Sequence, residues 1–104
     1  MSEPASISTG IAARYATAIF EIASESKSLG TLESSVTELA TALQASDDLR
    51  ELISSPLVSR DEQEKAIASV AEKMGLIAVL KDGLSLMAQK RRLFVLPQLL
   101  TQLA

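Results

Sequence analysis

Carboxylates are the side chains of this sequence that come nearest to a chemical function. Neighbouring carboxylates can share general acid and base roles when their environments differ. This sequence has two acidic groups, at residues 47–48 and 61–64. Each falls in the first turn of an expected helix, where negative charge stabilises the helix dipole. We favour this structural interpretation over catalysis. The two groups are Asp47 with Asp48, and Asp61 with Glu62 and Glu64.

Other kinds of chemistry lack the residues they need. The chain has no histidine and no cysteine, which removes imidazole bases, thiolates and the usual zinc ligands. It also has no glycine-rich phosphate loop and no G-x-S-x-G elbow. The net charge is −3, so a nucleic-acid partner is not expected. We expect no catalytic residue, no metal site and no cofactor.

The basic run Gln89–Arg92 and the apolar runs were considered for membrane contact. The basic run could touch an acidic lipid or a phosphate, but we favour a solvated helix end, where cations complement the dipole. The apolar runs are too short to span a bilayer, and the polar N-terminus does not have the pattern of a secretory signal. Direct membrane insertion is therefore not expected.

The composition and the apolar spacing predict an all-α fold. Alanine and leucine dominate, aromatic residues make up 3% of the chain, and no strand pattern occurs. We expect a six-helix bundle of short, mostly antiparallel helices over residues 8–104, after a flexible lead-in at residues 1–7. The expected helices cover about 8–27, 31–45, 47 to before Pro56, 60–74, 77–90 and 93–103.

Residues that commonly end or cap helices set these limits. Serine and threonine side chains cap N-termini, and a glutamate three residues later completes a capping box. Glycine ends helices, and proline fits only in a first turn or at a kink. The expected caps are Ser8 or Thr9, Ser46, and Ser59 with Glu62; the expected stops are Gly30 and Gly75; Pro97 is expected in a first turn or at a kink.

The first helix is more apolar than a helix at the edge of a small domain needs to be. At about 100° per residue its apolar residues cover an arc of about 200°, whereas a peripheral helix needs about 100°. Two adjacent stripes make up this arc. One holds Ala12, Ala16, Ile19, Phe20 and Ala23, and the other holds Ile11, Tyr15, Ala18 and Ile22.

The fifth helix repeats the pattern, and the second and fourth helices do not. Two interpretations remain open from periodicity alone. Both helices can be central and buried nearly all round. Alternatively, each buries one stripe and presents the other, so that together they form an apolar groove for an amphipathic helix, with small residues at Ala18 and Gly83 allowing close approach. The stripes of the fifth helix are Leu80, Leu84, Met87 and Ala88, and then Val79, Gly83 and Leu86.

Three blocks of the sequence resemble one family. "RYATAIFEIA" is similar to the R-Y-A-x-A-[LI]-F-x-x-A signature of the δ subunit of bacterial F-type ATP synthases, called the oligomycin-sensitivity-conferring protein in mitochondria. "DDLRELISSPLVSRDEQEKAI" and "GLSLMAQKRRLFVLPQLLTQL" resemble later blocks of the same family, in the same order. The resemblance covers about residues 8–104, which corresponds to the N-terminal domain of the family.

This resemblance implies a non-catalytic stator subunit that joins the catalytic head to the peripheral stalk. It implies binding of α-subunit N-terminal helices in a groove between the first and fifth helices, with β subunits nearby. Contacts with b-type stalk subunits would belong to a C-terminal domain that this chain lacks. The implied location is peripheral, on the cytoplasmic face of the bacterial inner membrane. The expected partner-binding residues are Ile11, Tyr15, Ala18, Ile22, Val79, Gly83 and Leu86.

One departure from the family pattern falls at the end of the fifth helix. The family usually has Asn-Gly before the arginine of its R-L-x-x-L-P block, and this chain has Lys90-Arg91. Two other functions stay open beside the stator role. The chain could be a self-associating helical scaffold or another helix-binding adaptor, or it could be a small enzyme or a lipid-surface module.

Overall fold

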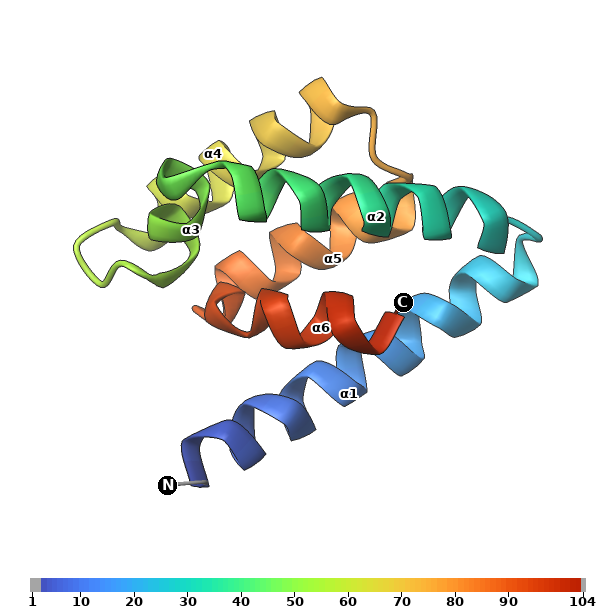
Figure 1. The fold of residues 1–104 in the computed structure, drawn as a ribbon, viewed down its shortest axis with the longest axis horizontal. Coiled ribbons are helices and arrows are strands. Elements are labelled where there is room, and N and C mark those ends of the chain that lie inside the picture. Colours follow the sequence, from blue (N-terminus) through green and yellow to red (C-terminus); the bar gives the residue numbers. More distant parts are fainter. Residues whose placement is uncertain (1–2, 104) are drawn as a thin grey trace.

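The computed structural model describes residues 3–103 and confirms the all-α fold. Within that range the chain forms six α-helices and one short 3₁₀ helix, and no strand (Figure 1). The helices are α1 (Glu3–Glu25), α2 (Leu29–Ala45), α3 (Asp47–Ser54), α4 (Arg60–Met74), α5 (Ala78–Gln89), η1 (Leu93–Val95) and α6 (Leu96–Leu103).

The first helix begins earlier than predicted. We expected a cap at Ser8 or Thr9, but α1 already starts at Glu3, so residues 3–7 are helical. Pro4 is compatible with this start, because the first backbone N–H groups of a helix have no partner within it. Residues 1–2 of the predicted flexible lead-in lie outside the described range.

The predicted caps of α3 and α4 are confirmed. The Ser46 side chain accepts a hydrogen bond from Leu49 N at the start of α3. At α4, Ser59 accepts from Glu62 N, and the Glu62 carboxylate accepts from Ser59 N, so the capping box is complete. These bonds satisfy N–H groups that a helix start otherwise leaves to water.

Three helices end on a residue in the left-handed conformation, and only one of these residues is glycine. Gly75 ends α4 with φ 68°, as predicted. The sequence predicts the break after α1 at residues 28–30, with Gly30 as the stop. Ser28 does lie between the two helices, but Gly30 as the stop is wrong, because Lys27 makes the reversal with φ 58° and Gly30 lies in the first turn of α2. Arg91 ends α5 in the same way, with φ 57°. Non-glycine residues adopt this conformation at a cost of about 1 kcal/mol.

Lys90-Arg91 stands where the family usually has Asn-Gly, so Arg91 takes the place of the glycine. Its left-handed backbone conformation is one that suits glycine. Arg91, which stands there, reaches back with its guanidinium to donate a hydrogen bond of 2.8 Å to Val58 O in the α3–α4 connection. The side-chain bond partly offsets the backbone cost. The substitution thus keeps the turn and adds a tie between two loops.

The sixth helix begins with a 3₁₀ turn. Leu93–Val95 form η1, and α6 follows at once, so Pro97 is the second residue of α6. The prediction that Pro97 lies in a first turn is therefore confirmed. Proline is tolerated there because a first-turn N–H has no partner within the helix.

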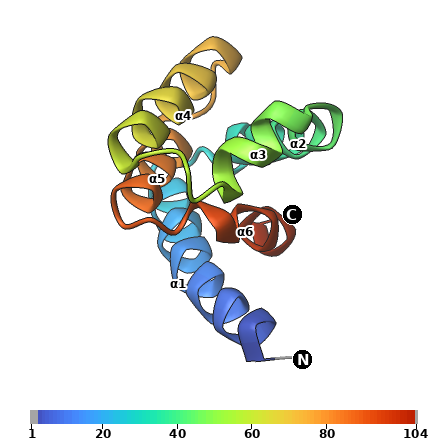
Figure 2. The ribbon, with the colours of Figure 1, turned by 90° about the vertical axis from the view of Figure 1, so that its left-hand side faces the viewer.

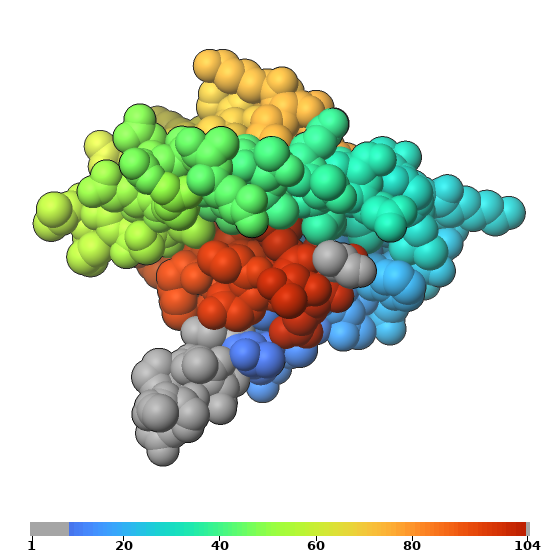
Figure 3. Space-filling view, in the orientation of Figure 1, coloured from blue at the N-terminus to red at the C-terminus, as the bar shows by residue number. Residues whose placement is uncertain are grey.

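The helices pack around α6 and α5. On the face shown in Figure 3, α6 lies between α2 and α1. Behind it α5 packs against α4 and α1 (Figures 1 and 2). The largest fully buried side chains come mainly from α5, η1 and α6: Leu39, Ile67, Leu80, Leu84, Met87, Leu93, Val95, Leu96 and Leu99.

A serine links α2 to the start of α5. Ser35 is buried, and its hydroxyl accepts a hydrogen bond of 3.0 Å from Ile77 N. Ile77 is the residue before α5, so this bond satisfies an N–H at the start of the helix. The start of α5 is therefore fixed from outside the helix itself.

Candidate partner-binding groove

A groove of about 450 Å³ runs along the surface between α1 and α5. We call it the α1–α5 groove. Six of the seven residues predicted to bind a partner line it. Ile11 is the exception, since it is half-buried against the core and does not line the groove. The groove is lined by Tyr15, Ala18, Ile19, Ile22, Ser26, Ser28, Ile77, Ala78, Val79, Asp82, Gly83 and Leu86.

The two apolar stripes of α1 have different surroundings, as expected if the helix buries one stripe and presents the other to a partner. Four of the five residues in the predicted inner stripe are buried, namely Ala12, Ala16, Ile19 and Ala23. In the outer stripe Ala18 is exposed and Ile22 is 53% exposed. The first helix is thus not buried all round. In its second stripe Ala18 and Ile22 are open to solvent, while Ile11 and Tyr15 are partly buried.

Phe20 is the fifth residue of the inner stripe, and its predicted burial is wrong. Its side chain is 52% exposed. At 100° per residue Phe20 lies about 70° from the centre of the buried stripe, on the edge away from the groove. Packing therefore ends before that edge, and Phe20 belongs neither to the core nor to the α1–α5 groove.

The fifth helix divides in the same way. Its inner stripe is fully confirmed, since Leu80, Leu84, Met87 and Ala88 are all buried. In its outer stripe Val79 and Gly83 are partly buried, and Leu86 is 42% exposed. Leu86 and Ile22 are therefore the large apolar side chains that the groove leaves most open to water.

Gly83 has a structural task that the sequence did not indicate. A Cβ built on Gly83 would stand 3.0 Å from Cδ1 of Ile19, a side chain of α1. The missing side chain therefore lets α5 approach α1 closely. We expected the small size of Gly83 to admit a partner. Gly83 does line the groove, and its small size also makes room for Ile19 within the chain.

Serine hydroxyls close one end of the groove, where α1 turns into α2. Ser26 Oγ donates 3.0 Å to Ile22 O, and Ser28 Oγ donates 3.3 Å to Ala23 O. The two hydroxyls are also 2.8 Å apart. Both side chains thus satisfy carbonyls at the end of α1, and they leave Asp82 as the charged group in the lining.

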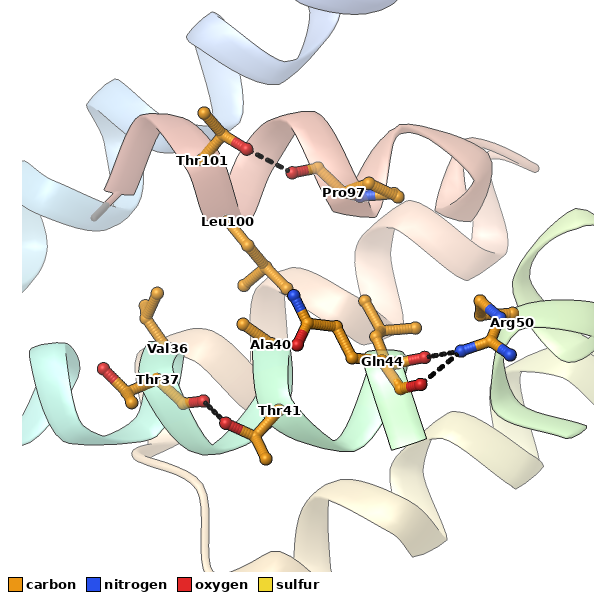
Figure 4. Close-up of a pocket in the computed structure, with 10 residues that line it drawn as sticks. Val36, Thr37, Ala40, Thr41, Gln44, Arg50, Pro97, Leu100 and Thr101 are labelled. Carbon is orange, nitrogen blue, oxygen red and sulfur yellow. Dashed lines mark hydrogen bonds between the residues drawn. The ribbon is translucent and has the colours of Figure 1, made fainter. Parts of the chain in front are cut away.

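A second and larger groove lies between α2 and α6. It has a volume of about 770 Å³ and is shown in Figure 4. We call it the α2–α6 groove. Its large aliphatic lining residues, Val36, Leu43 and Leu100, are already buried in the core. Two of its three threonine hydroxyls donate hydrogen bonds within the chain, Thr41 to Thr37 O and Thr101 to Pro97 O.

Arg50 closes one end of the α2–α6 groove. Its guanidinium donates to the carbonyl oxygens of Leu43 and Gln44, the latter at 2.7 Å (Figure 4). The same guanidinium also pairs with Asp47. Those carbonyls lie in the last turn of α2, where a cation complements the helix dipole. The arginine therefore serves the end of α2 and is not free for a ligand.

Three of the five acidic residues considered for catalysis have structural partners. Asp47 pairs with Arg50, the Glu62 carboxylate completes the α4 capping box, and Glu64 accepts a hydrogen bond of 2.8 Å from Gln89 Nε2. Among the described residues, no three histidine, cysteine or acidic side chains gather where they could hold a metal ion. No described helix is both long and apolar enough to cross a bilayer.

Fold and groove together define an all-α bundle with an open apolar groove on its surface. The chain belongs to the ATP synthase delta (OSCP) subunit family, whose model matches residues 11–104. The resemblance inferred from the three sequence blocks is thereby confirmed.

Curated relatives agree with the family match. The chain is 67% identical over 103 residues to the ATP synthase subunit delta of Ruegeria pomeroyi, covering 99% of this chain and 55% of that protein. It is 65% identical over 103 residues to the subunit of Ruegeria sp. strain TM1040, with the same coverage. For Rhodobacter capsulatus the identity is 62% over 104 residues, covering 100% of this chain and 56% of the relative. The chain thus spans about half the length of the relatives it matches.

Proposed function

We propose that this chain acts as a non-catalytic stator subunit of an F-type ATP synthase. In this role its α1–α5 groove binds the N-terminal helix of an α subunit, and the bound helix links the catalytic head to the peripheral stalk. The head is then held still while the rotor turns, as proton-driven ATP synthesis requires. The family membership supports the complex, and the groove supports the mode of binding.

One observation carries the binding mode: large apolar side chains remain exposed inside a preformed groove. Ile22 and Leu86 are each about half exposed, and they face the space between α1 and α5. An amphipathic helix laid in the groove would cover both. Completing the burial of a half-exposed aliphatic side chain contributes about 1 kcal/mol. Such a groove is a common docking site for an amphipathic helix.

The remaining expected partners follow from this placement. A subunit that holds the head through α-subunit helices has β subunits nearby, and it sits peripherally at the cytoplasmic face of the bacterial inner membrane. Contacts with b-type stalk subunits belong to the part of the family that this chain does not span. Neither nucleic acid nor a cofactor has a role in this proposal.

Self-association is the competing function, because a second copy could bury the same apolar stripes. A C₂ dimer would place the α1–α5 groove of one copy against that of the other. Sedimentation equilibrium of the chain separates the two ideas. We expect the chain to be a monomer at micromolar concentration. A dimer that becomes monomeric in the Leu86→Ser variant would favour self-association.

Ala18→Asp tests the groove directly. Ala18 is exposed at the groove wall, so an aspartate there places a charge where the partner's apolar face would lie, without disturbing the core. We expect binding of a synthetic α-subunit N-terminal peptide, measured by isothermal titration calorimetry, to weaken at least about 100-fold. The circular dichroism spectrum and the unfolding midpoint should stay close to those of the parent chain.

Thr17→Asp is the matched control. Thr17 is also exposed on α1, but it does not line the groove, so the same charge should leave peptide affinity within about twofold. Equal weakening by both variants would point to general charge repulsion and would contradict the groove. Loss of fold in Ala18→Asp would mean that Ala18 belongs to the core.

A further inference from the structure

Two loops at one end of the bundle hold apolar side chains out in water. Leu57, in the α3–α4 connection, is 92% exposed, and Phe94, in η1, is 48% exposed. Figure 2 shows the α3–α4 and α5–α6 connections on the same face of the molecule. We call residues 55–60 and 90–94 the two-loop surface. It lies apart from the α1–α5 groove and shares no lining residue with it.

The loop that carries Leu57 is held in place at several points. Leu57 N donates 3.2 Å to Ser55 Oγ, the Ser59 capping box fixes the other end, and Arg91 bonds to Val58 O. Arg91 does this from a left-handed backbone conformation that glycine would adopt with less strain. An ordered loop loses less conformational entropy on binding than a flexible one does. Leu57 is therefore presented to solvent by a preorganised loop.

The two-loop surface also carries exposed cations, which are close in sequence to Leu57 and Phe94. Among the described residues the one ion pair within 4.0 Å joins Arg50 to Asp47, so none of the cations of the two-loop surface has a carboxylate partner in the chain. The segment from residue 83 to residue 104 contains no acidic residue. The exposed cations are Arg60, Lys90, Arg91 and Arg92.

We propose that the two-loop surface binds an acidic segment of another protein, one that carries apolar side chains between its carboxylates. The cations would pair with the carboxylates, and the apolar side chains would cover Leu57 and Phe94. A broad anionic lipid surface fits less well, because it would also face Asp61 and Glu62 in the first turn of α4. A narrow peptide can contact the cations and leave those two carboxylates in water.

The test uses the whole chain and a labelled peptide of alternating glutamate pairs and leucines. Binding is followed by fluorescence anisotropy and compared with the same peptide carrying glutamine in place of glutamate. We expect the glutamate peptide to bind at least about tenfold more tightly. Arg92→Glu and Leu57→Ser should each weaken binding about tenfold, and the exposure of both side chains should leave the fold unchanged.

Lys73→Glu provides the matched control, since it makes the same charge change in the last turn of α4, away from the two loops. It should leave affinity within about twofold, as should Ala18→Asp in the α1–α5 groove. Three results would overturn the proposal: equal weakening by Lys73→Glu, no preference for the glutamate peptide, or binding to phosphatidylglycerol vesicles in place of the peptide.

Discussion

The two grooves of this bundle differ in what they leave for a partner to cover. The α2–α6 groove is the larger, at about 770 Å³ against 450 Å³, yet Val36, Leu43 and Leu100 in its lining are already buried. The smaller α1–α5 groove keeps Ile22 and Leu86 about half exposed. The hydrophobic contribution to binding scales with apolar area removed from water, not with empty volume. The large aliphatic side chains that a ligand can still cover therefore lie in the smaller groove.

The largest difference between the grooves should appear when a lining side chain is truncated. Leu100→Ala removes a buried side chain from the α2–α6 groove and should lower the free energy of unfolding by about 3 kcal/mol. Ile22→Ala in the α1–α5 groove should cost less than about 1 kcal/mol, because half of that side chain is already in water. Urea denaturation measures both. Similar losses would mean that Ile22 supports the core.

The hydrogen bond that fixes the start of α5 ranks next. The Ser35 hydroxyl accepts the hydrogen bond of Ile77 N–H. Ser35→Ala removes this acceptor and leaves the N–H unsatisfied. We expect a loss of about 1.5 kcal/mol in unfolding free energy and a weaker α-subunit peptide complex, since α5 forms one wall of the groove. Ser34→Ala, at the exposed neighbouring position, is the control and should change neither quantity.

Arg50, at the end of the α2–α6 groove, should contribute less to the free energy of unfolding and nothing to peptide binding. Arg50→Gln removes the cation that caps the carbonyls of Leu43 and Gln44, and should cost about 1 kcal/mol, since the side chain is half exposed. Peptide affinity of the α1–α5 groove should not change. If calorimetric titration showed that Arg50→Gln also lowers peptide affinity, the two grooves would be energetically coupled.

The smallest stability change is expected at the floor of the α1–α5 groove. In Gly83→Ala the gain in helix propensity, about 1 kcal/mol, opposes the close contact with Cδ1 of Ile19. The unfolding free energy should therefore move by less than about 0.5 kcal/mol. The added methyl group should still lower peptide affinity severalfold if the partner packs onto this floor. Unchanged affinity would show that Gly83 serves only the contact between α1 and α5.

Local signals in the sequence predicted most of the fold. The Ser59–Glu62 box and the left-handed Gly75 act through bonds within a few residues, so the sequence is enough to place them. The same holds for the two stripes of α5, whose four inner residues are all buried. Six of the seven predicted groove residues line one groove because helical spacing brought them onto adjoining faces.

The failures share one cause, which is that neighbours in space decided the outcome. Phe20 lies at an edge of the buried stripe, and only the packing of other helices determines where burial stops. Lys27, and not Gly30, makes the first reversal, since the position of α2 fixes where the chain must turn. The sequence did not predict the α2–α6 groove, because α2 has a single apolar stripe and α6 is short.

The contact between α1 and α6 has a consequence for the order in which the chain can fold during synthesis. More of α1 packs against α6 than against any other helix, and Gln102 Nε2 donates 3.1 Å to Thr9 O across almost the whole chain. The packing of α1 is therefore incomplete until α6 has been synthesised. A nascent chain that lacks α5 has no second wall for the α1–α5 groove, so it cannot capture a partner helix there until α5 has been made.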